Sequence, residues 1–203
     1  MLKFKLFAWI IAVFLMSFLL FSVESLFLQR SLAEKTLRLH VIANSDSLED
    51  QREKLDLRDY LLSLMEPLLN PCDSLDSMTR VLHRELASLE ASANRFMQVR
   101  GSEHPIHLTI GHENYSTRYY DSLSMPAGEY FSLQVHIGNA KGKNWWCIVF
   151  PNLCEGYSPN TFHDGASTAG YTPQEEALLT EKETKYELRF KVLEWINALI
   201  HPS

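Results

Sequence analysis

The chain has 203 residues, with 19 Lys and Arg against 25 Asp and Glu, and a formal net charge of −6 at pH 7. After residue 30 the imbalance is larger, with 16 basic against 24 acidic residues. This excess of acid disfavours nucleic acid and anionic lipid as main partners.

The first residues form an apolar segment with a basic start. Leu6–Val23 is an 18-residue stretch interrupted by two serines, and Lys3 and Lys5 precede it. A helix of that length spans roughly 27 Å, close to the hydrocarbon thickness of a thin bilayer. An uncleaved signal anchor, a cleaved signal peptide and a buried core helix all remain open, because only a weak cleavage site follows at residues 31–33.

We expect residues 1–30 to be a signal anchor or signal peptide, and residues 31–203 to be one globular α+β domain. Lys3 and Lys5 should stay in the cytoplasm, which places the domain outside the cytoplasm.

The first half of this domain predicts one strand and two helices. Residues 37–43 alternate apolar and polar side chains, as a strand does. Ser47 and Asp50 resemble a capping box for a helix over 48–66, which Pro67 should end. A second helix is expected over 74–97. The apolar stripe of the first helix is Leu48, Leu55, Leu62 and Met65, and that of the second is Leu75, Met78, Leu82, Leu86, Leu89, Ala93 and Phe96.

The pattern then changes to period two. Short strands are expected near 106–110 and 115–119, and longer ones over 128–137 and 145–150. The polar loop 138–144 between the last two strands favours a hairpin.

A helix start at Thr172-Pro173-Gln174-Glu175 opens a final helix to about Ile200. Its expected buried stripe is Tyr186, Phe190, Leu193, Ile196 and Ile200. The order of elements predicts a mostly antiparallel sheet with helices packed on it.

The three cysteines predict structure more than chemistry. Cys147 lies among apolar residues of a strand, which raises a thiol pKa, and neither Cys147 nor Cys154 has partners at metal-ligand spacing. A disulfide between them across the Phe150-Pro151 bend and a pair of buried thiols are both open, and Cys72 is expected to be a lone thiol. We expect no metal site and no cofactor.

Two short segments are candidate partner-binding residues. Trp145 and Trp146 point to opposite faces of their strand, so one of them is either exposed, as in a binding hot spot, or covered by the C-terminal helix. Asn144 precedes them. Asn44 and Asp46 lie in a strand-to-helix junction that local capping also explains.

Three segments together resemble one known family. LRLHVIANSDSLEDQREKLDLRD (37–59), MPAGEY (125–130) and NWWCIVFPNLC (144–154) are similar to stage II sporulation protein R of endospore-forming bacteria. The resemblance implies a protein made in the forespore and exported into the space between forespore and mother cell. There it would activate a membrane-embedded aspartic protease that processes pro-sigma E, without being an enzyme itself.

The resulting hypothesis is a signalling protein whose partner surface comprises Asn44, Asp46, Asn144, Trp145 and Trp146. One alternative is an envelope enzyme with a reactive Cys147 or Cys154 beside His136 or His163. Another is a cell-wall-binding module that uses Tyr115, Tyr119, Tyr120 and Trp145.

Overall fold

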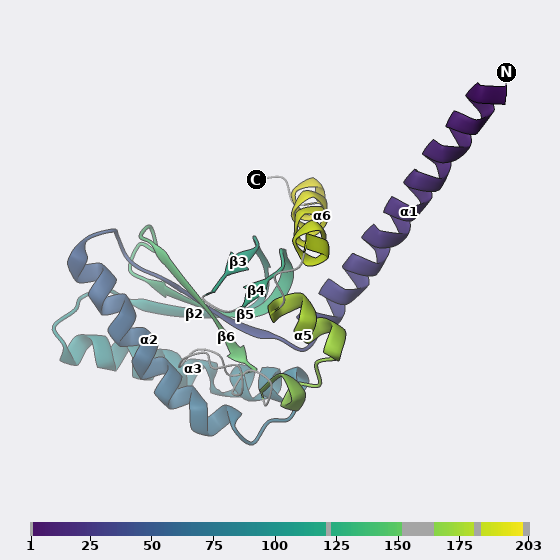
Figure 1. Cartoon of the computed structure of the whole chain (residues 1–203). Coiled ribbons are helices and arrows are strands. Elements are labelled where there is room, and N and C mark those ends of the chain that lie inside the picture. The colour runs from purple at the N-terminus through teal and green to yellow at the C-terminus, as the bar shows by residue number, and fades with distance from the viewer. Residues whose placement is uncertain (1, 121–122, 152–164, 181–183, 201–203) are drawn as a thin grey trace. The chain divides into compact units, whose positions relative to one another are not determined.

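The computed structural model describes residues 2–120, 123–151, 165–180 and 184–200 (Figure 1). These residues form two compact units. One comprises residues 34–113 and 129–171, and the other comprises 1–33, 114–128 and 172–203. The α+β class expected from the sequence is confirmed, with a mixed sheet, helices packed on it and an apolar N-terminal helix.

A four-stranded sheet organises the first unit, with strand order β2-β5-β1-β6. The strands are β1 (Leu37–Ile42), β2 (Ile106–Tyr115), β5 (Gly128–Ile137) and β6 (Asn144–Phe150). β1 pairs parallel with β5 and antiparallel with β6. The sheet is therefore mixed at its centre.

The expected hairpin of β5 and β6 is wrong, because β1 lies between these two strands. Alternation identifies each strand but does not say which strand is its neighbour. Five of the six residues of β1 are buried, so both of its faces are covered. A strand buried on both faces belongs in the middle of a sheet. The connection 138–143 therefore crosses the end of β1, which is decisive for the candidate site.

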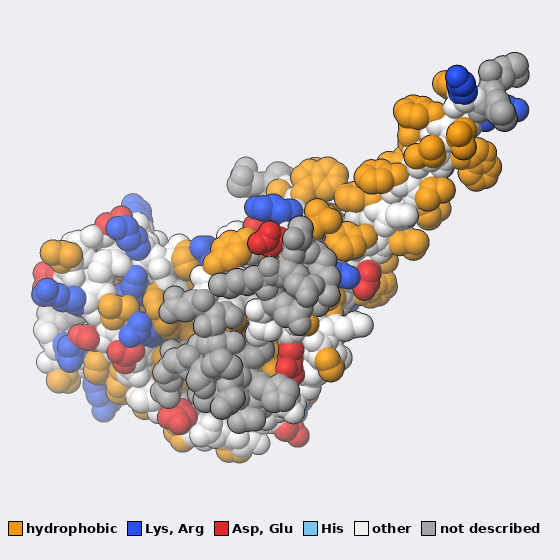
Figure 2. Space-filling model, viewed as in Figure 1, with side chains coloured by type: hydrophobic (Ala, Val, Ile, Leu, Met, Phe, Trp, Pro, Cys, Tyr) orange, Lys and Arg blue, Asp and Glu red, His pale blue; other side chains and the backbone are white. Residues whose placement is uncertain are grey.

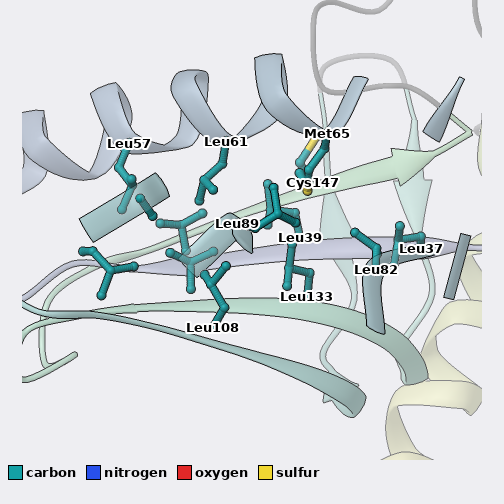
Figure 3. Close-up of a cluster of buried hydrophobic side chains, with 14 of the residues drawn as sticks. Leu37, Leu39, Leu57, Leu61, Met65, Leu82, Leu89, Leu108, Leu133 and Cys147 are labelled. Atoms are coloured by element: carbon teal, nitrogen blue, oxygen red, sulfur yellow. The ribbon is translucent and has the colours of Figure 1, made fainter. Parts of the chain in front are cut away.

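Two helices cover one face of this sheet, α2 (Leu48–Leu69) and α3 (Leu75–Val99). Figure 3 shows side chains from both helices meeting those of the strands in one apolar core. The apolar alternation predicted for β5 is confirmed, since Phe131, Leu133, Val135 and Ile137 all belong to the core. Four residues of the predicted α3 stripe are buried, namely Met78, Leu82, Leu89 and Ala93.

The predicted stripe of α2 is wrong in its first half. Leu48 is 80% exposed and Leu55 is 39% exposed. The buried face instead carries Asp50, Lys54, Leu57, Leu61, Met65 and Leu69, at helical spacing. Asp50 and Lys54 are polar because the N-terminal end of α2 faces groups to which they hydrogen-bond. α2 also continues through Pro67 to Leu69, beyond its predicted end.

The second unit contains helices α1 (Leu2–Ala33), α5 (Pro173–Thr180) and α6 (Thr184–Ile200), and the short strands β3 (Arg118–Tyr119) and β4 (Ser124–Met125). β3 and β4 pair antiparallel. The single final helix expected from the sequence is two helices, and residues 181–183 between them lie outside the described part. The capping box at the start of α5 is confirmed, because Thr172 and Glu175 exchange backbone-to-side-chain bonds of 2.6 and 3.3 Å.

Helix α1 meets the length and composition needed to cross a membrane. Its apolar window has a mean hydropathy of 2.6 and only 6% of it is buried, which disfavours a buried core helix. Figure 2 shows hydrophobic side chains along its visible length and Lys or Arg side chains near its N-terminal end. The prediction for the final stripe is partly wrong: Phe190 and Leu193 are buried, whereas Ile200 is 63% exposed.

Candidate partner-binding surface

The five predicted partner-binding residues lie together at one end of the sheet. β1 ends at Ile42, and Asn44 and Asp46 follow it directly. The antiparallel register places Asn144 opposite Ile42 and Trp145 opposite Val41. We call Asn44, Asp46, Asn144, Trp145 and Trp146 the junction surface. Their proximity follows from the central place of β1 in the sheet.

Asn44 joins three segments through its side chain and backbone. Its Oδ1 accepts a hydrogen bond from the Asn139 backbone N–H at 2.9 Å, and its Nδ2 donates to Asp50 Oδ2 at 2.9 Å. Its backbone carbonyl accepts from the Lys141 N–H at 3.2 Å. The residue thus ties the β5–β6 connection to the first turn of α2.

Hydrogen bonds to the backbone of Lys143 hold the same connection at a second point. The Lys143 backbone N–H donates to Asp46 Oδ1 at 2.7 Å, and the Lys143 carbonyl accepts from Lys54 Nζ at 2.9 Å. Lys54 Nζ also donates to Gln51 Oε1 at 2.7 Å. Burial of the ammonium is the main cause that lowers the pKa of Lys54 below its usual value. These contacts explain why a lysine occupies the buried face of α2.

Two glycines in the connection allow this close packing. Gly138 has a φ of +55°, and a Cβ there would come within 2.5 Å of Asn44 Oδ1. A Cβ on Gly142 would overlap the backbone carbonyl of Ser45. Gly142 N–H also donates to the Ala43 carbonyl at 2.8 Å. The polar loop 138–143 therefore packs closely against the segment after β1, although its composition alone predicts only a turn.

Asp50 is the buried carboxylate at the centre of the junction. Its Oδ2 accepts from Asn44 Nδ2 and from Ser45 Oγ, and its backbone N–H donates to Ser47 Oγ at 3.1 Å. The bond from Ser45 is the largest cause of a lowered Asp50 pKa, with Asn44 and the charge of His104 acting in the same direction against desolvation. Of the predicted capping box, only the bond from the Asp50 backbone N–H to Ser47 Oγ is present. The Asp50 carboxylate instead accepts hydrogen bonds from Asn44 and Ser45.

A histidine from outside α2 completes this cluster. His104 Nδ1 lies 3.0 Å from Glu53 Oε2 and 3.8 Å from Asp50 Oδ1. The three side chains offer ligand atoms within 4.8 Å of one another, as a metal site would require. The hydrogen bond between His104 and Glu53 accounts for the arrangement without an ion. From the sequence, Asp50 was expected only as a helix cap, and neither Glu53 nor His104 was a predicted site residue. His104 lies 51 positions after Glu53, so no local pattern connects them.

The two tryptophans lie on opposite faces of β6, as predicted. Trp145 packs against the core, and the Arg58 guanidinium lies over its ring at 4.7 Å from the centroid. Trp146 stacks on His40 with ring centroids 5.3 Å apart. Both indoles are half-buried.

His40 extends the surface on the Trp146 face. Its Nδ1 lies 2.6 Å from Glu113 Oε1, and the imidazole is buried. Desolvation, followed by the charge of His40, lowers the pKa of His136 on the neighbouring strand. Neither Arg58 nor His40 was a predicted site residue. The packing of α2 on the sheet brings Arg58 to Trp145, and the register of β1 and β6 brings His40 to Trp146.

The cysteines fit a structural role better than catalysis. Cys147 is disulfide-bonded and buried, while Cys72 has a free thiol. Cys154, the predicted disulfide partner of Cys147, lies outside the described residues, and so does His163. The pairing of Cys147 with Cys154 and any chemistry of Cys154 with His163 therefore stay predictions. A disulfide-bonded Cys147 cannot supply the thiolate that a nucleophile requires.

The aromatic residues suggested for glycan binding differ in exposure. Tyr115 is 2% exposed, so its ring cannot stack on a sugar, whereas Tyr119 is 67% exposed. A platform built from all four suggested aromatics is therefore disfavoured.

The described residues thus define an α+β protein with one helix able to cross a membrane and a hydrogen-bonded junction at the end of its sheet. The sequence model of the family described as stage II sporulation protein R matches residues 33–158. A relative named Stage II sporulation protein R, from Bacillus subtilis (strain 168), is 30% identical over 165 residues, which cover 81% of this chain and 68% of the relative. No solved structure matches. The chain belongs to the stage II sporulation protein R family.

Proposed function

We propose that this sporulation protein acts outside the cytoplasm as a signal that activates a membrane-embedded aspartic protease, which then processes pro-sigma E. It would be exported from the forespore into the space between forespore and mother cell, with residues 1–30 as its signal anchor or signal peptide. Family membership supports the sporulation role, and the apolar α1 supports membrane association. Activation would be by contact, without chemistry by this chain.

The observation that carries the proposed contact surface is the fixed junction between β1, α2 and the β5–β6 connection. Asn144 is exposed and directly precedes two half-buried tryptophans. Partly buried Trp and Arg side chains that are already held in place lose little entropy on binding, and they are enriched in binding hot spots. In this role Asn44 would position the surface, while Asp46 and Asn144 would orient the partner.

A contact of this kind activates only if it binds the active state of the protease better than the inactive state. A preference of about 2.7 kcal/mol would shift that equilibrium roughly 100-fold. A few well-placed side chains can supply this difference, since single hot-spot residues contribute about 2 kcal/mol or more.

The test is co-reconstitution of the full chain, the protease and pro-sigma E in one membrane, with the processed fraction as the readout. We expect Asn144→Ala and Trp146→Ala to reduce processing at least 10-fold. Asn139→Ala is the matched control, because its side chain is exposed and only its backbone N–H contributes to the junction. Full processing by both variants would rule out this surface as the contact site for the protease. No processing with the native chain would reject the signalling role.

A further inference from the structure

Helix α6 carries a second apolar stripe that its packing leaves uncovered. Phe190 and Leu193 are buried on one side of the helix, and Val192 is buried on another. Leu188, Trp195 and Leu199 follow one another by seven and four residues, so they share a different side, and they are 53%, 60% and 64% exposed. A helix that is apolar on two sides is typical of a membrane-contacting or fully buried segment.

Charge is absent from the last part of α6. Its charged residues are confined to positions 185–194, and the following stretch Trp195–Ile200 (WINALI) has none. Lys191 and Glu194 form an ion pair with 3.0 Å between Nζ and Oε2, which lowers the cost of their proximity to an apolar phase. The uncharged end is thus the part best suited to enter lipid.

Arg189 fixes the height of α6 along α1. Its guanidinium lies 3.0 Å from Glu24 Oε1 and 4.9 Å from the centroid of the Phe21 ring, and it donates to Ser25 Oγ at 3.4 Å. These contacts lie at the C-terminal end of the apolar stretch of α1, where its first carboxylate occurs. Such a position corresponds to the boundary between hydrocarbon and water for a helix that crosses the bilayer.

From this level α6 continues toward the apolar side. α1 and α6 run in opposite directions, so the C-terminal end of α6 lies toward the apolar, N-terminal part of α1 (Figure 1). A helix rises about 1.5 Å per residue, which puts Trp195 about 9 Å and Leu199 about 15 Å beyond Arg189 along the axis of α6. Figure 2 shows hydrophobic side chains over α6 as well as along α1.

We propose that the C-terminal half of α6 inserts into the lipid interface beside α1, with Leu188, Trp195 and Leu199 against lipid. The inference rests on the proposed membrane insertion of α1. The axial distances are upper limits on depth for a helix that enters lipid at an angle. Trp195 therefore suits the interfacial level, where indole rings are enriched, and Leu199 and Ile200 suit the deeper acyl chains. The occupant is bilayer lipid without a required headgroup charge, since residues 184–200 hold three basic and two acidic side chains.

The experiment uses the full chain with Cys72→Ser, reconstituted in phosphatidylcholine nanodiscs and spin-labelled at one introduced cysteine. Collision with oxygen is compared with collision with a water-soluble nickel chelate. Leu199→Cys reports the proposed stripe, and Lys191→Cys is the matched control on the same helix, because Lys191 is exposed and charged. Leu15→Cys reports the insertion of α1.

We expect the labels at positions 15 and 199 to collide at least 5-fold more with oxygen than with the nickel chelate, and the label at 191 to show the reverse order. A lipid-embedded label at 15 with a water-exposed label at 199 would overturn the inference for α6 alone. A label at 199 shielded from both reagents would also overturn it, since protein rather than lipid would cover the stripe. A water-exposed label at 15 would reject both α1 insertion and this inference.

Discussion

The Asn139 backbone N–H donates to Asn44 Oδ1 at 2.9 Å, joining residues 95 positions apart in the chain. The bond links the connection after β5 to the segment after β1. Because the Asn44 amide also donates to Asp50 at 2.9 Å, one side chain couples the sheet end to α2. The junction surface depends on this bond for its shape.

Replacing Asn44 should therefore destabilise the fold without touching its core. Asn44→Ala removes both side-chain bonds and leaves the buried Asp50 carboxylate with fewer donors, which we expect to cost about 2 kcal/mol. Urea unfolding followed by near-UV circular dichroism measures it. Asn139→Ala retains the backbone donor and should change the free energy of unfolding by less than about 0.5 kcal/mol. Equal losses in the two variants would contradict the assigned role of Asn44.

Gly142 should not tolerate a side chain. A Cβ there would overlap the Ser45 carbonyl, so Gly142→Ala must displace either the connection or the junction. We expect a loss of at least about 2 kcal/mol in the free energy of unfolding. Gly111→Ala is the matched control, because no atom lies within 4 Å of the added Cβ. There the exchange should be neutral or stabilise by up to about 1 kcal/mol. A neutral Gly142→Ala would show that the connection does not pack as described.

Periodicity in the sequence was sufficient for most of the elements and for the core stripes of α3 and β5. It was insufficient for the strand order, because alternation in β5 and β6 is the same whether they pair with each other or with β1. It also failed at the start of α2. There Asp50 and Lys54 are buried through bonds to distant groups, such as the Lys143 carbonyl, while Leu48 is exposed. Hydrophobic patterns cannot identify a polar side chain whose burial depends on partners far along the chain.

The candidate surface shows the same division between local and long-range information. Residue type alone made Trp145, Trp146 and Asn44 candidates for a binding surface. That Trp145 and Trp146 face opposite sides follows from strand geometry. Their neighbours Arg58 and His40 come from α2 and β1. Only the antiparallel register of β1 with β6 brings His40 opposite Trp146.

The contact between Arg58 and Trp145 should contribute a small, measurable stability. Arg58→Met keeps most of the aliphatic stem but removes the charge over the indole, which we expect to cost about 0.5 to 1 kcal/mol. Arg58 also pairs with the exposed Asp59 at 2.6 Å. Asp59→Asn weakens that ion pair and leaves the indole contact, so it should cost less than about 0.5 kcal/mol. Thermal unfolding of both variants separates the two contributions, and a larger loss in Asp59→Asn would assign the stability to the ion pair.

Asp50 should make the fold sensitive to acid. Hydrogen bonds from Ser45 and Asn44 hold its pKa below the usual value of 3.8, so the folded chain favours the carboxylate. The resulting stability is present above pH 3.8 and is lost as the pH falls through the lower folded pKa, because the proton then neutralises the bonded carboxylate. Asp50→Asn should therefore cost about 2 kcal/mol at pH 7, as expected for bonds to a charged acceptor.

That cost should shrink below pH 3.8 as the native carboxylate becomes protonated. Urea unfolding of the native chain and the variant at pH 7, 5, 3 and about 1.5 measures the difference at each pH, with about 0.3 kcal/mol resolvable between them. Glu49→Gln is the matched control, since Glu49 occupies the same first turn of α2 but is exposed. Its effect should be small at every pH. A difference between the native chain and Asp50→Asn that stays constant from pH 7 to well below the folded pKa would show that the Asp50 charge does not stabilise the junction.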